Sequence, residues 1–159
     1  MTSKHRIYPF KPLSIAVGNT STMILPPIRD SLNPAMINDW VTGTIYAQGA
    51  IVRSNGRYYW ATVGGTSGAT APIQTDGDAT DGLMNWRVVR GLREVISVTN
   101  MGEGTVFVAR GYPAVASAGI VLYKGGSQNE GYENGEVRPY DGAYYAISDS
   151  TVTLAISEG

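Results

Sequence analysis

Residues 46–68 read YAQGAIVRSNGRYYWATVGGTSG, and this stretch predicts a β-hairpin. Asn55 and Gly56 separate GAIVRS from RYYWATV, and both tolerate the positive φ that a two-residue hairpin turn requires. Side chains alternate between the two faces of a strand, so Tyr58 and Trp60 share the outer face. The opposite face is expected to join other rings in a small core, made by Trp40, Tyr46, Tyr59 and Trp86.

The composition of the chain favours strands and tight turns. Its 159 residues include 20 glycines and 10 tyrosines, and only 16% of residues are charged, below the usual level of about 25%. No cysteine is present, which excludes disulfides, thiolate zinc sites and cysteine nucleophiles. The sequence also predicts no membrane-spanning segment and no cleaved signal peptide.

Charge is distributed unevenly along the chain, although the formal net charge is only −1. Residues 1–29 contain four bases and no acids, whereas residues 103–159 contain seven acids and three bases. A basic front and an acidic back suit docking onto an acidic partner or head-to-tail contact between copies. Ordinary surface variation is the alternative explanation.

Three segments are expected, and all of them are β. Residues 1–37 form an extended N-terminal arm and a β-hairpin in which LSIAV and TMIL flank GNTS. Residues 38–91 form a small aromatic β-module, with GGTSGATAP and TDGDATDG as loops. Residues 92–159 form a β-sandwich or jelly-roll-like domain with five short strands, REVISVTN, GTVFVAR, GIVLYK, GAYYAIS and TVTLAIS. Alternatively, the N-terminal hairpin completes this sandwich.

Residues for catalysis are sparse. The only histidine, His5, lies in the arm, which argues against a Ser-His-Asp constellation. DGDATDG at residues 76–82 fails the register of a calcium loop, since its glycine comes one position late and its twelfth position is Arg87. We expect no enzyme activity, no catalytic residues, no metal and no cofactor.

Residues 39–90 carry a recognisable aromatic spacing, W-x5-Y-x2-G-x2-V-x3-G-x2-Y-x-A, followed by a glycine-rich loop and Trp86. The pattern resembles the small chitin- and cellulose-binding β-module, and it is also similar to domains in virion proteins of tailed bacteriophages. The sugar-binding modules carry exposed rings directly after the Tyr-x-Ala strand. Here Val63 and Gly64 stand at that place, and neither offers a π-face for stacking.

The C-terminal segment resembles a domain of small phage structural proteins. That resemblance rests on an Asn-x-Gly strand end at Asn100, a GIVL strand leading to GGS, and a terminal hairpin reading YAIS and TVTLAISE.

Together these resemblances imply a structural protein of a tailed-phage virion, a decoration or cement protein on the outer capsid surface that is made in the host cytoplasm. The expected partners are the major capsid protein and further copies of the chain, as a homotrimer or another homo-oligomer, with no nucleic acid and no membrane. The capsid-contact candidates lie in the arm: Lys4, Arg6, Tyr8, Phe10 and Lys11.

An alternative is a head- or tail-fibre module that binds a host surface glycan. Its rings would be Tyr58 and Trp60, joined by Tyr112, Tyr132 and Tyr140. The same Tyr58 and Trp60 could instead pack on the sandwich or on another subunit. A third alternative is a fragment of a polysaccharide-degrading enzyme that lacks its catalytic domain.

Overall fold

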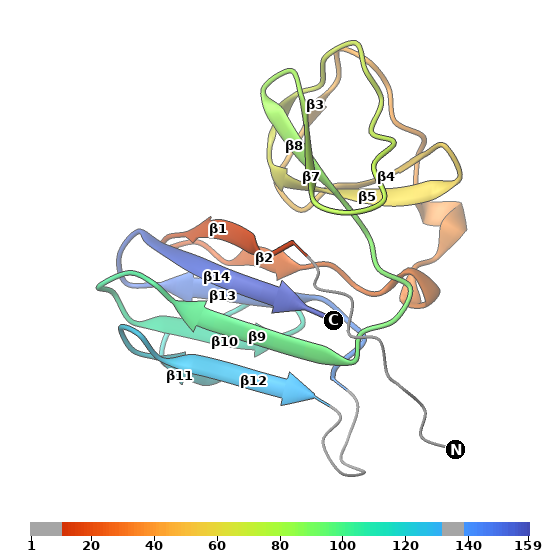
Figure 1. The fold of residues 1–159 in the computed structure, drawn as a ribbon. Coiled ribbons are helices and arrows are strands. Elements are labelled where there is room, and N and C mark those ends of the chain that lie inside the picture. Colours follow the sequence, from red (N-terminus) through yellow and green to blue (C-terminus); the bar gives the residue numbers. More distant parts are fainter. Residues whose placement is uncertain (1–10, 132–138) are drawn as a thin grey trace, which may run out of the picture.

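The computed structural model describes residues 11–131 and 139–159, and this part of the chain is built from strands (Figure 1). The all-β prediction is confirmed. A sandwich of two sheets lies below a smaller aromatic module, which is inserted between the second and third strands of the sandwich. Two short 3-10 helices stand in the connection that enters the module, η1 (Arg29–Ser31) and η2 (Pro34–Met36).

The sandwich consists of two four-stranded antiparallel sheets. The first has the order β1 (Leu13–Val17), β14 (Val152–Glu158), β9 (Val95–Asn100), β12 (Ser127–Gly131). The second has the order β11 (Ile120–Leu122), β10 (Val106–Arg110), β13 (Tyr144–Ser148), β2 (Thr22–Leu25). Alternate residues of the strands face inward, as Leu13, Ile15 and Val17 do in β1, so the core lies between the sheets.

The two N-terminal strands form where the sequence predicts them, but they do not pair as a hairpin. β1 pairs with β14 and β2 pairs with β13, so the GNTS segment crosses from one sheet to the other. The strands of the expected C-terminal hairpin, β13 and β14, likewise lie in different sheets. Each strand has an apolar face, and membership of opposite sheets lets those faces meet across the core.

The module contains a four-stranded sheet and a two-stranded ribbon. The sheet has the order β4 (Ile51–Ser54), β5 (Arg57–Val63), β8 (Met84–Val88), β7 (Asp78–Asp81), and the ribbon pairs β3 (Ile45–Tyr46) with β6 (Gly65–Thr66). The predicted β4–β5 hairpin is confirmed: Ser54 pairs with Arg57, and Asn55 and Gly56 have φ of 46° and 72°.

Three strands of the module and one of the sandwich form where no strand is expected. β6 and β7 lie in segments predicted as loops, and β3 and β12 are additional strands. β6, β7 and β12 are polar segments. An edge strand such as β7 or β12 needs backbone pairing on one side only, so most of its side chains can stay in solvent and its sequence carries no apolar pattern. Asp81, at the end of β7, is the buried exception.

The predicted aromatic core of the module is confirmed. Tyr59 and Trp86 are fully buried, and Trp40 and Tyr46 pack against them while partly exposed. The rings of Tyr46 and Trp86 meet edge to face at 5.2 Å between centroids. This core stands on the face of β5 that the alternation of side chains indicates.

A buried carboxylate holds this ring cluster together. Oδ2 of Asp81 accepts hydrogen bonds from the indole Nε1 of Trp40 at 3.0 Å and of Trp86 at 3.3 Å. Its Oδ1 accepts from the backbone amide of Gly68 at 2.7 Å. The carboxylate therefore fixes two rings and the glycine-rich loop at one point.

The module covers the side of the sandwich that β1 and β2 form (Figure 1). Trp60, on the opposite face of β5, is 1% exposed and packs within the sandwich core, together with Val89. Ile51 and Tyr58 are partly buried against the same cluster. The seam between module and sandwich is therefore an extension of the sandwich core, and it shields an edge that would otherwise be open.

Arg93 lies where the chain leaves the sandwich after β2 and re-enters it before β9, and these two connections are called the stem. Its side chain is 1% exposed, and its Nε donates to Glu158 at 2.8 Å. Nη2 donates to the carbonyl of Pro26 at 2.8 Å, on the outgoing connection. Nη1 donates to the carbonyls of Tyr140 and Gly142, at 2.9 and 3.2 Å. One guanidinium thus joins both connections to the C-terminal strand.

We predict that Arg93→Ala lowers the free energy of unfolding by about 3–5 kcal/mol, because it leaves Glu158 and several carbonyls without their buried donor. Urea unfolding measures this loss. Arg29→Ala is the control, since the Arg29 side chain is 59% exposed and, among the described residues, its ion pair is with its neighbour Asp30; the loss in this variant should stay below about 1 kcal/mol. Equal, small losses in both variants would contradict this role of Arg93.

Candidate functional site

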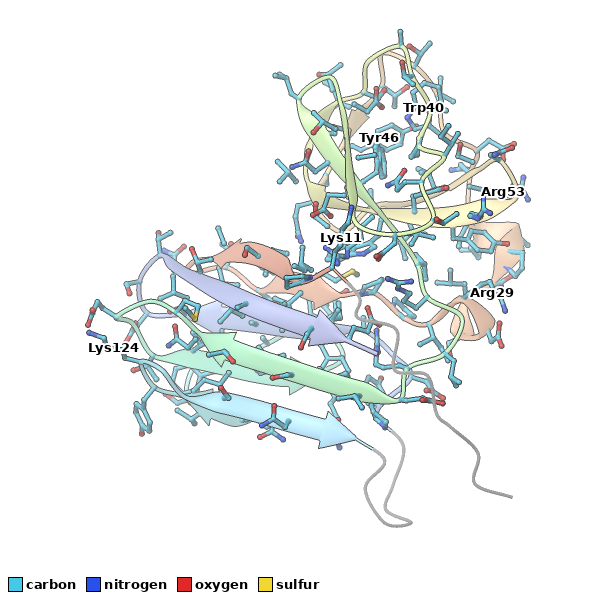
Figure 2. All side chains as sticks on the ribbon, viewed as in Figure 1. Lys11, Arg29, Trp40, Tyr46, Arg53 and Lys124 are labelled. Atoms are coloured by element: carbon cyan, nitrogen blue, oxygen red, sulfur yellow. The ribbon has the colours of Figure 1, made fainter. Side chains whose placement is uncertain are left out.

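The predicted capsid-contact segment enters the described structure at Lys11. Lys4, Arg6, Tyr8 and Phe10 lie outside the described residues. Figure 2 shows Lys11 at the seam between the module and the sandwich. This seam, with the residues that hold Lys11, is the candidate site for the arm.

Arg87 holds the backbone of Lys11 and Pro12, the two residues that form the root of the arm. Its Nη2 donates to the carbonyl of Lys11, and its Nη1 donates to the carbonyl of Pro12 at 3.5 Å. Asp78 orients the guanidinium through an ion pair at 3.3 Å, and the Arg87 side chain is only 9% exposed. Because Arg87 and Asp78 lie on neighbouring strands β8 and β7, the arm is attached to the module sheet as well as to β1.

The side chain of Lys11 runs across Gly77. A Cβ added at Gly77 would lie 2.7 Å from Cδ of Lys11, and Gly77 has a φ of 72°. The positive φ favours glycine at this position, and the missing Cβ leaves the space that the lysine side chain occupies. The Lys11 side chain therefore packs on the turn before β7.

Asp76 completes the root through a second ion pair, with Arg90. Burial by itself raises the pKa of Asp76, but the Gly77 amide, the Arg90 guanidinium and the Lys11 amide together outweigh it. The pKa of Asp76 consequently lies below its ordinary value. The carboxylate is ionised at neutral pH and accepts a hydrogen bond from the backbone of the arm.

A small cavity of about 10 Å³ lies behind this root, and it has room for about one water molecule. Its walls come from both units: Leu13, Leu25, Arg87, Arg90, Ile156 and Glu158. The seam is closely packed here, so the root is an anchoring point and not a ligand pocket.

Tyr58 and Trp60 do not form an exposed ring pair. Trp60 is buried in the sandwich core, and Tyr58 is partly buried against it. Of the three roles expected for these residues, the structure shows packing on the sandwich of the same chain. Trp60 has no free face to stack on a glycan or to contact another subunit, because the sandwich already covers it.

The other tyrosines considered for glycan binding differ in exposure. Tyr112 is 73% exposed and meets Tyr145 edge to face, at 5.2 Å between centroids. Tyr140 is 40% exposed and packs edge to face on Tyr144. Tyr132 lies outside the described residues. Tyr112 therefore presents the most accessible of the described rings in this set.

Two large apolar side chains are exposed at the tip of the module. Ile45 is 80% exposed and Leu83 is 78% exposed. They flank Thr66, which pairs with Ile45 and accepts a hydrogen bond from the Leu83 amide. Adjacent exposed apolar side chains are typical of a surface that contacts another protein.

The aspartates of the rejected calcium loop have structural partners. Asp76 pairs with Arg90, Asp78 pairs with Arg87, and Asp81 binds the two indoles. Within residues 11–131 and 139–159, no three His, Asp or Glu side chains are grouped so that they could hold a metal ion. The same residues contain no helix long and apolar enough to cross a membrane.

Sequence reasoning missed Arg87 and Arg93 as organising residues. Both arginines stand beside apolar residues: Arg87 lies between Trp86 and Val88, and Arg93 comes just before the apolar strand segment VISV. Such an arginine is costly to bury without partners. Its partners here are distant in sequence, as Lys11 and Pro26 show.

Comparison with known proteins adds no relative. No protein-family model matches the chain, and no curated protein matches it significantly.

We predict that Asp76→Asn lowers the free energy of unfolding at pH 7 and that this difference disappears in acid. The pKa of Asp76 is lowered on folding, so the carboxylate stabilises the fold above its unfolded-state pKa of about 3.9. That contribution is lost as the pH falls through the folded-state pKa. Urea midpoints of both proteins between pH 7 and pH 2 measure the effect.

Asp30→Asn is the control for this series, since the Asp30 side chain is 68% exposed and its ion pair within the described part of the chain is with its neighbour Arg29. Its midpoint should follow that of the wild type throughout. A difference in urea midpoint between wild type and Asp76→Asn that stays constant from pH 7 to pH 2 would contradict the lowered pKa of Asp76.

Proposed function

We propose that the protein is a non-enzymatic structural protein of a tailed-phage virion, which binds the outer capsid surface as a decoration or cement protein and stabilises the head. The observation that carries this proposal is the anchored root of the basic arm. Arg87 and Asp76 hold the backbone of Lys11 at the packed seam. A partner that binds the arm would therefore hold both the module and the sandwich.

Charge supports an acidic partner for the arm. Arg29, the last base of the acid-free segment, forms an ion pair with Asp30. Lys4, Arg6 and Lys11 are then the bases of residues 1–12, and no acid stands among them. A short basic segment of this kind suits an acidic seam between capsid subunits, where opposite charges steer and orient binding.

The proposed partners are the major capsid protein and further copies of the chain, as a homotrimer or another homo-oligomer. The exposed Ile45 and Leu83 at the module tip support a second protein contact away from the arm. A contact of about 1,600 Å² suffices for stable attachment. Repetition over the shell increases the effective affinity of a connected array.

The second candidate function is a head- or tail-fibre module that binds a glycan or receptor. The exposed ring of Tyr112 favours it, whereas the burial of Trp60 removes the ring pair on which the sequence hypothesis depended.

Co-sedimentation with undecorated capsids of the parent phage tests the capsid proposal. We expect saturable binding of the wild type, and a loss of roughly tenfold in affinity for the double variant Lys4→Glu/Arg6→Glu, because reversed charges repel an acidic seam. The loss should shrink as salt rises and screens the charges.

Lys124→Glu, a single charge reversal away from the arm, is the control. Lys124 lies at the end of the sandwich remote from the seam (Figure 2), and its ion pair with Glu103 is exposed. This variant should bind as the wild type does. Absence of wild-type binding, or equal losses in the arm variant and in the control, would refute the proposed attachment.

A further inference from the structure

A groove opens on the seam away from the root of the arm. It has a volume of about 360 Å³, within the range of about 300–1,000 Å³ typical of small-molecule sites. Both units line it: the module supplies Gln48 and Gly49, and the sandwich supplies Ser21, Met23, Tyr112 and Tyr145.

Hydrogen bonds fix the walls of the groove. Nε2 of Gln48 donates to the carbonyl of Met23 at 2.6 Å, across the seam. Oγ of Ser21 accepts from the amide of Ala114 at 2.8 Å, and this bond holds the loop that carries Tyr112. The shape is therefore present before any ligand binds, which reduces the ordering cost of binding.

Two tyrosine rings stand on one side of the groove. Tyr145 is partly buried, whereas Tyr112 is 73% exposed. Their planes are inclined by 66°, and such an edge-to-face pair covers at most one ring face. Tyr112 thus keeps an apolar face toward solvent beside polar groups that can orient a ligand.

The groove lining carries no charged side chain. It offers two phenol hydroxyls, a primary amide, a serine hydroxyl and a thioether. A charged ligand would lose solvation here without gaining a counter-charge. The chemistry instead matches a neutral ligand that has both hydroxyl groups and apolar C–H faces.

The polar groups of the groove can still bind a ligand. Gln48 donates to Met23 through its amide nitrogen, and its amide oxygen receives no hydrogen bond from the described residues, so that oxygen can accept one from a ligand. Burial, and next the neighbouring Tyr112, raise the pKa of Tyr145, so its hydroxyl remains a donor at neutral pH.

An added peptide strand fits this place poorly. β2 is an edge strand, which is where a peptide would extend the sheet. Gln48 already occupies the carbonyl of Met23, in the middle of that short strand. The blocked edge favours a compact ligand that lies on the rings.

We propose that this groove binds a neutral saccharide, with the ring of Tyr112 as the stacking surface and with Gln48 and Tyr145 as hydrogen-bonding groups. The site is distinct from the capsid-binding arm, and it combines residues of the module and of the sandwich. It does not use Tyr58 or Trp60. A virion protein with such a site would also contact glycans on a host surface.

Amide chemical shifts of the full chain, titrated with uncharged oligosaccharides of glucose, N-acetylglucosamine, galactose, mannose and rhamnose, test the proposal. We expect at least one sugar to bind saturably, with shift changes centred on residues 21–23, 48–49, 111–114 and 145. Tyr112→Ala should weaken binding roughly tenfold. Tyr112→Phe should bind nearly as well as the wild type, because it keeps the ring.

Tyr123→Ala is the matched control, since Tyr123 is 70% exposed but does not line the groove. It should bind as the wild type does. The proposal is overturned if no sugar shifts the groove residues, if Tyr112→Ala and Tyr123→Ala behave alike, or if an uncharged Gly-Ser peptide shifts the groove and the sugars do not. No capsid enters this assay, so its outcome is independent of the proposed attachment.

Discussion

The buried guanidinium of Arg93 is the constraint on which the arrangement of the chain depends. A charge that is 1% exposed requires acceptors on all sides. Arg93 finds them on Glu158, on Pro26 and on the loop before β13. The planar fork of an arginine can reach these acceptors together, which a lysine could not do. Three distant parts of the chain therefore meet where the module leaves and rejoins the sandwich.

The seam beside this stem carries the features on which both proposals rest. Trp60 fills it from the module side, as part of the sandwich core. The root of the basic arm stands on one side of it, where Arg87 holds Lys11. The uncharged groove with Tyr112 opens on another side. The proposed attachment to a shell and the proposed contact with a glycan would thus use separate surfaces of the molecule.

Local signals in the sequence predicted local structure well. The Asn55-Gly56 turn needs only its own residues, and the alternation along β5 correctly placed Tyr59 in the module core. The same alternation put Trp60 on the outer face, but what covers that face depends on a sheet remote in sequence. The partners of β1 and β2 were unpredictable for the same reason, since their apolar faces fit either a hairpin or two opposed sheets.

The claim that module and sandwich form one cooperative body can be tested most directly by urea unfolding observed in both units. Tryptophan fluorescence reports on the module and the seam, because Trp40 and Trp86 belong to the module core and Trp60, also in the module, packs against the sandwich. Amide resonances of β9 and β14 report on the sandwich. We predict a single transition with the same midpoint for both probes. A module that unfolds at lower urea, while β9 and β14 keep their native resonances, would contradict the account.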